Sequence, residues 1–247
     1  MKLQILKPKD KTDSFTKKKN KTFDLPFRLL IVGKTGMGKT SILYSLLLQD
    51  NKEFYRNDFE PERIFIFSGS LQGDNKLKII RKELDIPDEN TFSEYDEEAV
   101  EVIYDMMVDE YNEALENKEK PKPFLMIFDD LSFNSSMKGQ EKQSQMNRLF
   151  MNSRKFLGNI IVMSQKYSDL GTGLRENASG LILGKSSNKQ LDLIEADHNY
   201  LKNKKLFREM FLDNTKDKHD FLVINFSKPE LYFDKNFEPL EDKENLN

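Results

Sequence analysis

The chain has 247 residues, of which 37% are hydrophobic and 33% charged, and its net charge is −3. This length suffices for one α/β domain with a sizeable core, and no stretch approaches the roughly eighteen apolar residues of a membrane span. Without cysteine the chain has no disulfide, thiolate metal site or cysteine nucleophile. The N-terminus has no long apolar segment, so no secretory signal is expected.

Residues 1–22 form a basic segment with eight lysines and two aspartates, a local charge of +6. This composition is typical of a flexible, solvated arm, whose densest part is Lys17, Lys18 and Lys19. A contact with nucleic acid or an acidic partner is the alternative, because the negative net charge leaves such contacts to local basic patches.

A glycine-rich loop follows a short apolar strand at residues 28–32 and precedes a helix predicted over 39–49. Its residues match the P-loop spacing and are Gly33, Lys34, Thr35, Gly36, Met37, Gly38, Lys39, Thr40 and Ser41. The glycines let backbone N–H groups turn toward a phosphate, and the helix dipole favours the same anion. We expect Lys39 to reach the β- and γ-phosphates and the Thr40 hydroxyl to bind Mg²⁺.

A second apolar strand at 63–68 reads as buried on both faces of a parallel sheet, and helices are predicted over 74–84 and 96–117. The strand from Phe124 to Phe128 then runs into Asp129 and Asp130, as a Walker B strand does. Asp129 is predicted to hold Mg²⁺, and Asp130 to polarise the attacking water. Acids at a strand end are a weak signal alone, and the pairing with the P-loop strengthens it.

The next helix, predicted over 141–156, carries Arg148 and Arg154, and a buried strand over 159–164 leads to Gln165. Gln165 would lie beside the nucleotide if this strand lies between the P-loop strand and the Walker B strand; otherwise it faces water. A turn and short helix at 167–177 holds Arg175. The clustering of these arginines suggests stabilisation of transition-state charge, within a subunit or across an interface.

The rest of the chain contains a strand at 181–183, a mostly helical basic segment at 188–211, and a strand at 221–226 with a hairpin partner at 231–233. His198 and His219 have no evident metal or catalytic companions and are expected to be ordinary surface or packing residues. An acidic tail at 236–247 is predicted to be flexible. The folded P-loop domain is therefore predicted over residues 23–235.

The chain lacks the sequence motifs of two other classes of nucleotide-binding protein, regulatory GTPases and small-molecule kinases. A regulatory GTPase would need Asp-x-x-Gly after the Walker B strand, and the third residue after Asp129 is Ser132. The base-reading motif Asn-Lys-x-Asp is also missing. Residues 188–190 match its first three positions, but the fourth is Leu191 and not aspartate. The eight arginines do not form the arginine-rich lid of a small-molecule kinase.

Together these motifs resemble those of the viral genome-packaging ATPases of the FtsK–HerA superfamily, in particular the poxvirus-type packaging ATPases of large DNA viruses and their virophage relatives. The resemblance covers residues 27–195 and is carried by the P-loop, by Phe-Asp-Asp-Leu at 128–131, by Asn-Ser-Arg-Lys-Phe at 152–156, by the strand ending in Ser-Gln at 160–165, and by Leu-Arg-Glu-Asn at 174–177. Two positions depart from the family pattern: Lys155 stands where histidine is common, and Asp130 where the wider superfamily often has glutamate.

The resemblance implies a P-loop NTPase with a central, mostly parallel sheet flanked by helices, in which extra strands separate the Walker A and Walker B strands. It implies an ATP- and Mg²⁺-dependent ring of identical subunits that drives double-stranded DNA into a capsid, with capsid or portal proteins as partners. It places such a protein in the host cytoplasm or a viral factory, or with the virion, and away from membranes. Gln165 would sense the γ-phosphate, and Arg154 or Arg175 would enter the neighbouring active site, with a slight preference for Arg175.

The sequence offers three basic surfaces for contact with DNA. The candidate surfaces are the loop with Lys138 and Lys142, the basic helix from Lys202 to Arg208, and the N-terminal arm. Two other functions remain alternatives: a helicase or DNA pump of the same superfamily with a cellular role, and an ATP-dependent switch with little turnover.

Overall fold

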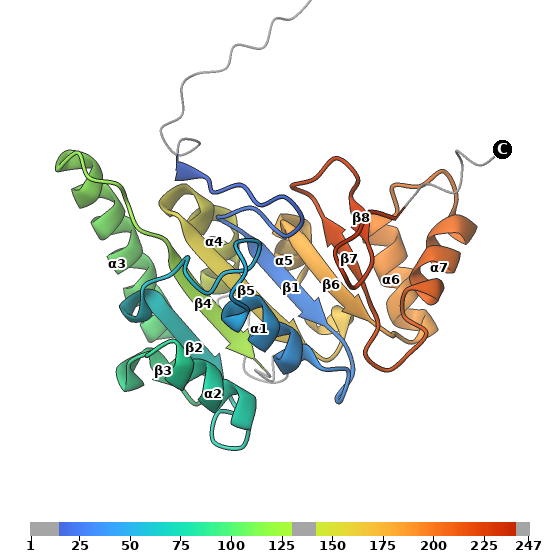
Figure 1. The fold of residues 1–247 in the computed structure, drawn as a ribbon, viewed down its shortest axis with the longest axis horizontal. Coiled ribbons are helices and arrows are strands. Elements are labelled where there is room, and N and C mark those ends of the chain that lie inside the picture. Colours follow the sequence, from blue (N-terminus) through green and yellow to red (C-terminus); the bar gives the residue numbers. More distant parts are fainter. Residues whose placement is uncertain (1–14, 130–141, 241–247) are drawn as a thin grey trace, which may run out of the picture.

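The computed structural model describes residues 15–129 and 142–240. Their central feature is one eight-stranded sheet with the strand order β3-β2-β4-β5-β1-β6-β7-β8 (Figure 1). The strands are β1 (Arg28–Val32), β2 (Ile64–Ser68), β3 (Thr91–Phe92), β4 (Phe124–Asp129), β5 (Gly158–Ser164), β6 (Gly180–Gly184), β7 (Phe221–Asn225) and β8 (Tyr232–Phe233). The helices are α1 (Lys39–Leu48), α2 (Asn75–Glu83), α3 (Glu97–Glu116), α4 (Lys142–Asn152), α5 (Thr172–Asn177), α6 (Asn188–His198) and α7 (Lys204–Asp213).

The sheet is mostly parallel, as the sequence predicts. Strands β1 to β6 pair in parallel, whereas β7 joins β6 and β8 joins β7 in antiparallel pairs. Strands β2, β4, β5 and β6 are buried along their whole length, which explains their continuous apolar sequences: both faces of the sheet are covered.

Two layers of helices cover the sheet. Helices α1 and α2 pack on the face turned toward the viewer in Figure 1, where Leu43, Leu46 and Ile80 join one apolar cluster. Helices α3 to α7 supply apolar side chains to the cluster on the opposite face. The P-loop helix is therefore held against the strands that carry the catalytic candidates.

Strand β5 lies between β4 and β1, so an extra strand separates the Walker A strand from the Walker B strand. The register pairs Asp129 with Met163 and Val32 with Ser164. Because these strands are parallel, their carboxyl ends meet at one edge of the sheet, directly beside the P-loop. This confirms the interposed strand that the resemblance implies.

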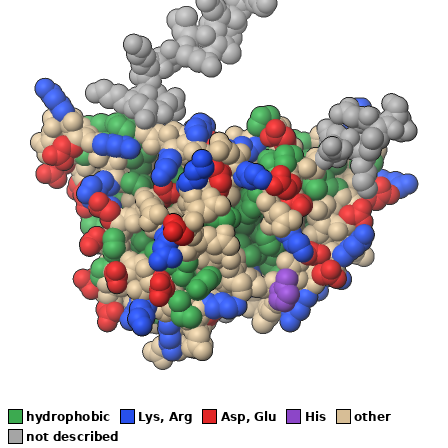
Figure 2. Space-filling model, viewed as in Figure 1, with side chains coloured by type: hydrophobic (Ala, Val, Ile, Leu, Met, Phe, Trp, Pro, Cys, Tyr) green, Lys and Arg blue, Asp and Glu red, His purple; other side chains and the backbone are tan. Residues whose placement is uncertain are grey.

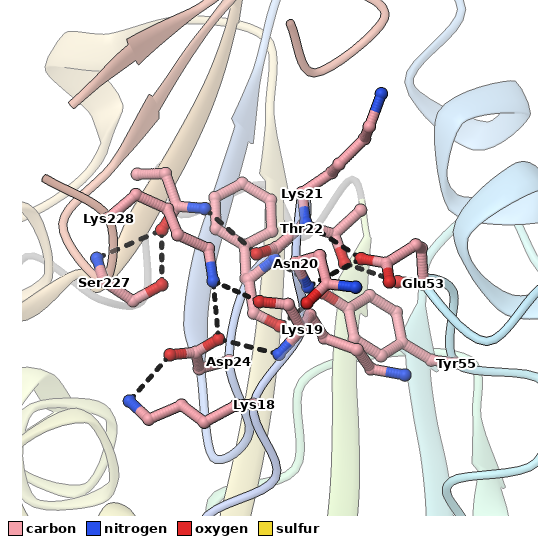
Figure 3. A network of polar contacts seen from close by, with 12 residues as sticks. Lys18, Lys19, Asn20, Lys21, Thr22, Asp24, Glu53, Tyr55, Ser227 and Lys228 are labelled. Atoms are coloured by element: carbon pink, nitrogen blue, oxygen red, sulfur yellow. Dashed lines mark hydrogen bonds and ion pairs between the residues drawn. The ribbon is translucent and has the colours of Figure 1, made fainter. Parts of the chain in front are cut away.

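The described part of the predicted N-terminal arm, residues 15–22, packs on the domain, which corrects the expectation of solvated chain (Figure 3). Lys19 is 5% exposed, and its Nζ lies 2.8 Å from Asp58 Oδ2 and donates to the carbonyl oxygen of Phe54 at 2.9 Å. Lys18 pairs with Asp24 at 2.8 Å, and Lys17 pairs with Asp58. The lysine-rich sequence suggested solvation, but Asp58, about 40 positions away, pairs with Lys17 and Lys19, and the nearer Asp24 pairs with Lys18. Residues 1–14 lie outside the described residues.

The predicted acidic tail also begins later than expected. Phe237 is 7% exposed and packs edge-on against the Phe23 ring, with 5.9 Å between the ring centroids. Pro239 forms an isolated bridge with Phe233. Residues 236–240 thus belong to the domain, and residues 241–247 lie outside the described residues. No helix in the described ranges combines the length and apolar character needed to cross a membrane.

Candidate nucleotide-binding site

The P-loop backbone depends on two glycines with left-handed dihedral angles. Gly36 has φ 79° and Gly38 has φ 105°, a region that side-chain-bearing residues rarely adopt. Gly38 is the N-cap of α1 and makes no side-chain cap, so the first N–H groups of this ten-residue helix remain available to an anion. At the other end of the loop, the Gly33 N–H donates to the Ser164 carbonyl oxygen at 3.1 Å, which ties the loop to β5.

Met37 acts as a packing anchor for the loop. Its side chain is 5% exposed, and a Cβ added at Gly33 or Gly184 would lie 2.2 or 2.7 Å from the Met37 Sδ. The thioether therefore fills the space left by two glycines beneath the loop. The P-loop pattern predicts Met37 as a nucleotide-binding residue, and the burial of its side chain limits that contribution to backbone atoms.

A cleft of about 580 Å³ opens between the P-loop and the carboxyl ends of the neighbouring strands. It brings together predicted site residues from three separate parts of the chain: Lys39 and Thr40, Asp129, and Gln165. Thr35, Gly36, Gly38 and Ser41 also line it. The Lys39 Nζ donates to the Gly33 carbonyl oxygen at 3.0 Å, so the lysine is held over its own loop.

Asp129 is buried and oriented by hydroxyl groups from the adjacent strand end. Asp129 is 4% exposed, and its Oδ2 accepts hydrogen bonds from Ser68 Oγ at 3.2 Å and Ser70 Oγ at 3.3 Å. Ser68 lies directly opposite Asp129 in the β2–β4 register. The pairing of strands therefore places a donor next to the carboxylate.

The donor set fits Mg²⁺ bound together with a nucleotide. Thr40 and Asp129 both line the cleft and carry a hydroxyl and a carboxylate, and Mg²⁺ prefers oxygen ligands from one or two protein groups, phosphates and water. Within the described ranges, no group of three or more His, Cys, Asp or Glu residues could hold a metal alone. The metal would accordingly depend on nucleotide phosphates for several of its ligands.

Other predicted site residues lie elsewhere. Gly33 and Met37 support the loop from beneath, and Lys34 points to a neighbouring hollow of about 620 Å³ that shares Thr35 and Gln165 with the cleft. Asp130, the predicted base, is outside the described residues. Neither Arg154 nor Arg175 lines the cleft of its own chain.

Arg175 is held in a network within the chain. Its guanidinium forms an ion pair with Asp197 and lies 5.2 Å from the centre of the Tyr167 ring, and its side chain is 12% exposed. The Tyr167 Oη lies 2.9 Å from Asp197 Oδ2 and 2.6 Å from His198 Nε2. To reach a neighbouring subunit, Arg175 would have to leave this network.

Arg154 is exposed and lies in the turn 153–156 that precedes β5. This turn is at the amino edge of the sheet, because Gly158 pairs with Phe124 at the start of β4. Burial, and then the charge of Arg154, lower the pKa of Arg28 at the start of β1. Arg154 therefore lies about 20 Å from the cleft, the length of a seven-residue strand.

Six residues that line the cleft were not predicted as site residues: Ser70, Gly73, Asp74, Asn75, Lys76 and His219. Ser70 follows β2, and a polar residue at a strand end was a usable signal. Lys76, in the first turn of α2, lines the cleft and donates to Ser41 Oγ. His219 also lines the cleft, and its Nδ1 lies 2.9 Å from the Met37 carbonyl oxygen. The expectation that His219 is an ordinary surface or packing residue missed this contact, because nothing local in the sequence signals a neighbour 182 positions away.

The fold and the cleft define a P-loop ATPase with a strand interposed between Walker A and Walker B. The family model described as "Poxvirus A32 protein" matches residues 14–232, and this chain belongs to that family, a family of ATPases. A search of curated protein sequences found no match.

Solved structures share the fold at low sequence identity. The DNA-packaging ATPase B204 from Sulfolobus Turreted Icosahedral Virus is 14% identical with a TM-score of 0.54, and the match covers 88% of this chain and 99% of B204. The pCW3 conjugation coupling protein TcpA, as a monomer with ATPγS, is 16% identical with a TM-score of 0.54, over 87% of this chain and 61% of TcpA.

A third match is EssC (ATPases 2 and 3) from Geobacillus thermodenitrificans, at 17% identity and a TM-score of 0.49. It covers 72% of this chain and 35% of the EssC chain. This chain thus spans about a third of the length of EssC and less than two thirds of TcpA.

Proposed function

We propose that this chain is the subunit of a ring-shaped motor that hydrolyses Mg–ATP to move double-stranded viral DNA into a capsid. The observation that carries the proposal is the cleft in which Lys39, Thr40, Asp129 and Gln165 converge, in a member of the poxvirus A32 protein family. The related fold of B204, which is described as a DNA-packaging ATPase, also supports a role in DNA packaging.

In this proposal each cleft residue has one role. The N–H groups of the P-loop and the Lys39 ammonium bind the phosphates, and Gln165 at the end of β5 contacts the γ-phosphate or its attacking water. Thr40 and Asp129 hold Mg²⁺, which neutralises charge on the β- and γ-phosphates when it is bound. Asp130, next in sequence to Asp129, accepts a proton from the water.

Arg154 is our candidate for the residue that enters the neighbouring site. A ring uses two different surfaces at each interface, one from each subunit, so a residue acting in a neighbour lies away from its own cleft. Arg154 is exposed at the opposite edge of the sheet, whereas Arg175 is occupied by Asp197. The slight preference for Arg175 that the sequence suggested is therefore replaced by a preference for Arg154.

DNA contact is proposed at the hollow beside the P-loop. Its lining includes four exposed lysines: Lys34, Lys166, Lys185 and Lys189. Within residues 15–129 and 142–240, no ion pair joins any of the four to a carboxylate. Unpaired lysines bind phosphates without reading sequence, as a translocating motor requires.

The basic surfaces named in the sequence analysis are weaker candidates. In helix α7, Lys204 pairs with Glu195, and Arg208 pairs with both Asp192 and Glu195. The arm lysines pair with carboxylates of the domain, as described above. Lysine and arginine side chains alternate with acidic ones across the face in Figure 2. Lys138 lies outside the described residues, as does the side chain of Lys142.

The test is ATP turnover by the full chain without DNA, with linear duplex DNA and with single-stranded DNA. We expect duplex DNA to stimulate turnover, and Lys185→Ala/Lys189→Ala to reduce the stimulation by roughly tenfold while leaving basal turnover unchanged. The matched control is Lys202→Ala/Lys204→Ala/Lys205→Ala, which we expect to retain the stimulation. Stimulation by single strands alone would favour the helicase, and turnover near zero in all three conditions would favour the switch.

Partners and location follow from the same proposal. The chain would assemble with copies of itself and dock on capsid or portal proteins, in the host cytoplasm, a viral factory or the virion. Sedimentation of the chain with ATP and duplex DNA tests the ring, which is expected to form only when both are present.

A further inference from the structure

The loop between α7 and β7, residues 214–220, covers the outer side of the P-loop. The Asp220 N–H donates to the Asp217 carbonyl oxygen at 3.2 Å, which makes Lys218 and His219 the two central residues of a tight turn. A Cβ added at Gly36 would lie 3.2 Å from the Lys218 Cε, and one added at Gly38 would lie 3.4 Å from the His219 Nδ1. The turn is therefore in close contact with the loop that binds phosphate.

The turn is fixed in place from both ends. Thr215 is 1% exposed, and its Oγ1 donates to the Phe211 carbonyl oxygen at 2.8 Å. Asp220 pairs with Lys235 at 2.7 Å. Because these contacts hold the base of the loop, His219 is presented to the cleft at a defined position without being buried itself.

The contact with the P-loop determines what His219 can offer to a ligand. The Met37 carbonyl oxygen only accepts hydrogen bonds, so the His219 Nδ1 carries the proton in their 2.9 Å contact. In a neutral imidazole this tautomer leaves Nε2 as an acceptor. His219 is exposed and lines the cleft, so its side chain can meet a molecule bound there.

The strand order indicates which part of a nucleotide lies there. Asp129 and Gln165 follow β4 and β5, on one side of β1, whereas the 217–220 turn precedes β7, two strands away on the other side. A triphosphate whose γ-phosphate lies at Asp129 and Gln165 runs along the P-loop and leaves it on the opposite side. Its ribose and base then emerge toward the turn.

We propose that His219 contacts the ribose and base of the nucleotide bound at the P-loop. A hydroxyl group of the ribose or an amino group of the base would donate to Nε2, and the imidazole face would cover part of the sugar or base. This supplies the base-side contact that the chain lacks in the form of an Asn-Lys-x-Asp motif. The inference rests on nucleotide binding, which the proposed function also requires, but not on DNA translocation.

The test compares two ligands that share the phosphate chain. Calorimetric binding of Mg–ATP and of Mg–tripolyphosphate is measured for the wild type, His219→Ala and the control Lys216→Ala, an exposed neighbour that pairs with Asp213. We expect His219→Ala to weaken ATP binding roughly tenfold and to change tripolyphosphate binding less than about twofold, since a lost hydrogen bond is worth about a factor of ten. Lys216→Ala should match the wild type for both ligands.

Two results would overturn the inference. Equal weakening of both ligands would mean that His219 only supports the P-loop, and unchanged ATP binding would mean that it does not touch the nucleotide. Thermal unfolding without ligand shows whether His219→Ala remains folded, and its tripolyphosphate affinity reports an intact P-loop. DNA is absent from the assay, so failure here is separate from a failure of duplex DNA to stimulate turnover.

Discussion

The Ser68 hydroxyl lies 3.2 Å from the Asp129 carboxylate, and Ser70 approaches the same oxygen at 3.3 Å. Hydrogen bonds to a metal-binding carboxylate fix its orientation, and their loss typically weakens metal affinity by about 10- to 100-fold. We expect Ser68→Ala/Ser70→Ala to raise the Mg²⁺ concentration needed for half-maximal ATP turnover by about tenfold. Ser93→Ala, at an exposed serine away from the cleft, is the control. An unchanged Mg²⁺ dependence would separate these serines from the role of Asp129.

Lys39 donates to the Gly33 carbonyl oxygen at 3.0 Å and has its ammonium group over the phosphate-binding loop. Lys39→Ala removes the only side-chain charge that the P-loop motif aims at the β- and γ-phosphates, and we expect ATP turnover to fall by at least about 100-fold. Lys78→Ala, at an exposed lysine on α2, is the matched control. Near-normal turnover in Lys39→Ala would show that hydrolysis occurs at another site.

The parts of the fold that local sequence determines were predictable. Continuous apolar segments identified the buried strands within one or two residues. The P-loop glycines marked the positions where the backbone adopts left-handed dihedral angles. Asp129 and Gln165 could be placed at the cleft because parallel strands bring their carboxyl ends to one edge. The interposed strand followed from the resemblance, and the strand order confirms it.

Contacts between distant segments were not predictable. Lys19 looked like solvated chain because its partners, Asp58 and the Phe54 carbonyl, are 39 and 35 positions away. His219 meets Met37 only because β7 and its preceding turn fold back beside β6. Charge and hydrophobic periodicity describe one segment of the sequence at a time, so they do not predict contacts between side chains of distant segments.

Asp130 is predicted to act on the attacking water, and its replacement should separate binding from hydrolysis. Asp130→Asn preserves the size of the side chain and removes its basic carboxylate, so we expect ATP affinity within about threefold of the wild type and turnover lowered by about 100-fold or more. Binding is measured by calorimetry and turnover by phosphate release on the same preparation. Turnover at the wild-type level would reject Asp130 as the base.

Mixed rings can distinguish the two candidate arginines. A Lys39→Ala subunit has a defective cleft and an intact Arg154, whereas an Arg154→Ala subunit has the opposite defect. If Arg154 acts in the neighbouring cleft, mixing these two inactive proteins should restore roughly a quarter of wild-type turnover, because about that fraction of interfaces pairs two intact surfaces. The control mixture contains Lys39→Ala with Lys34→Ala/Lys39→Ala, in which no cleft is intact and no recovery is expected.

The parallel experiment with Arg175→Ala has a different expected outcome. Arg175 pairs with Asp197 and covers the Tyr167 ring, so its loss should lower the thermal unfolding temperature by several degrees. Recovery of turnover in a Lys39→Ala and Arg175→Ala mixture, without recovery with Arg154→Ala, would reinstate Arg175 as the residue that crosses the interface.

The His198 side chain should make the domain less stable in mild acid. Burial lowers the pKa of His198 from 6.5 to about 4, with the nearby Arg175 charge acting in the same direction and Asp197 opposing both. Between pH 6.5 and pH 4 the unfolded chain therefore binds a proton that the folded chain does not, so stability falls as the pH falls through this range. The full effect is roughly 3 kcal/mol, reached near pH 4.

Urea unfolding at pH 7, 6 and 5 measures this dependence. His198→Gln keeps a donor that can reach the Tyr167 hydroxyl, which lies 2.6 Å from His198 Nε2 in the wild type, and it removes the titrating group. We expect the variant to be less stable than the wild type at pH 7 but to lose less stability between pH 7 and pH 5. The control is His219→Gln, which makes the same replacement at the exposed other histidine of the chain. Equal pH dependence in His198→Gln and the wild type would assign the acid sensitivity to other groups.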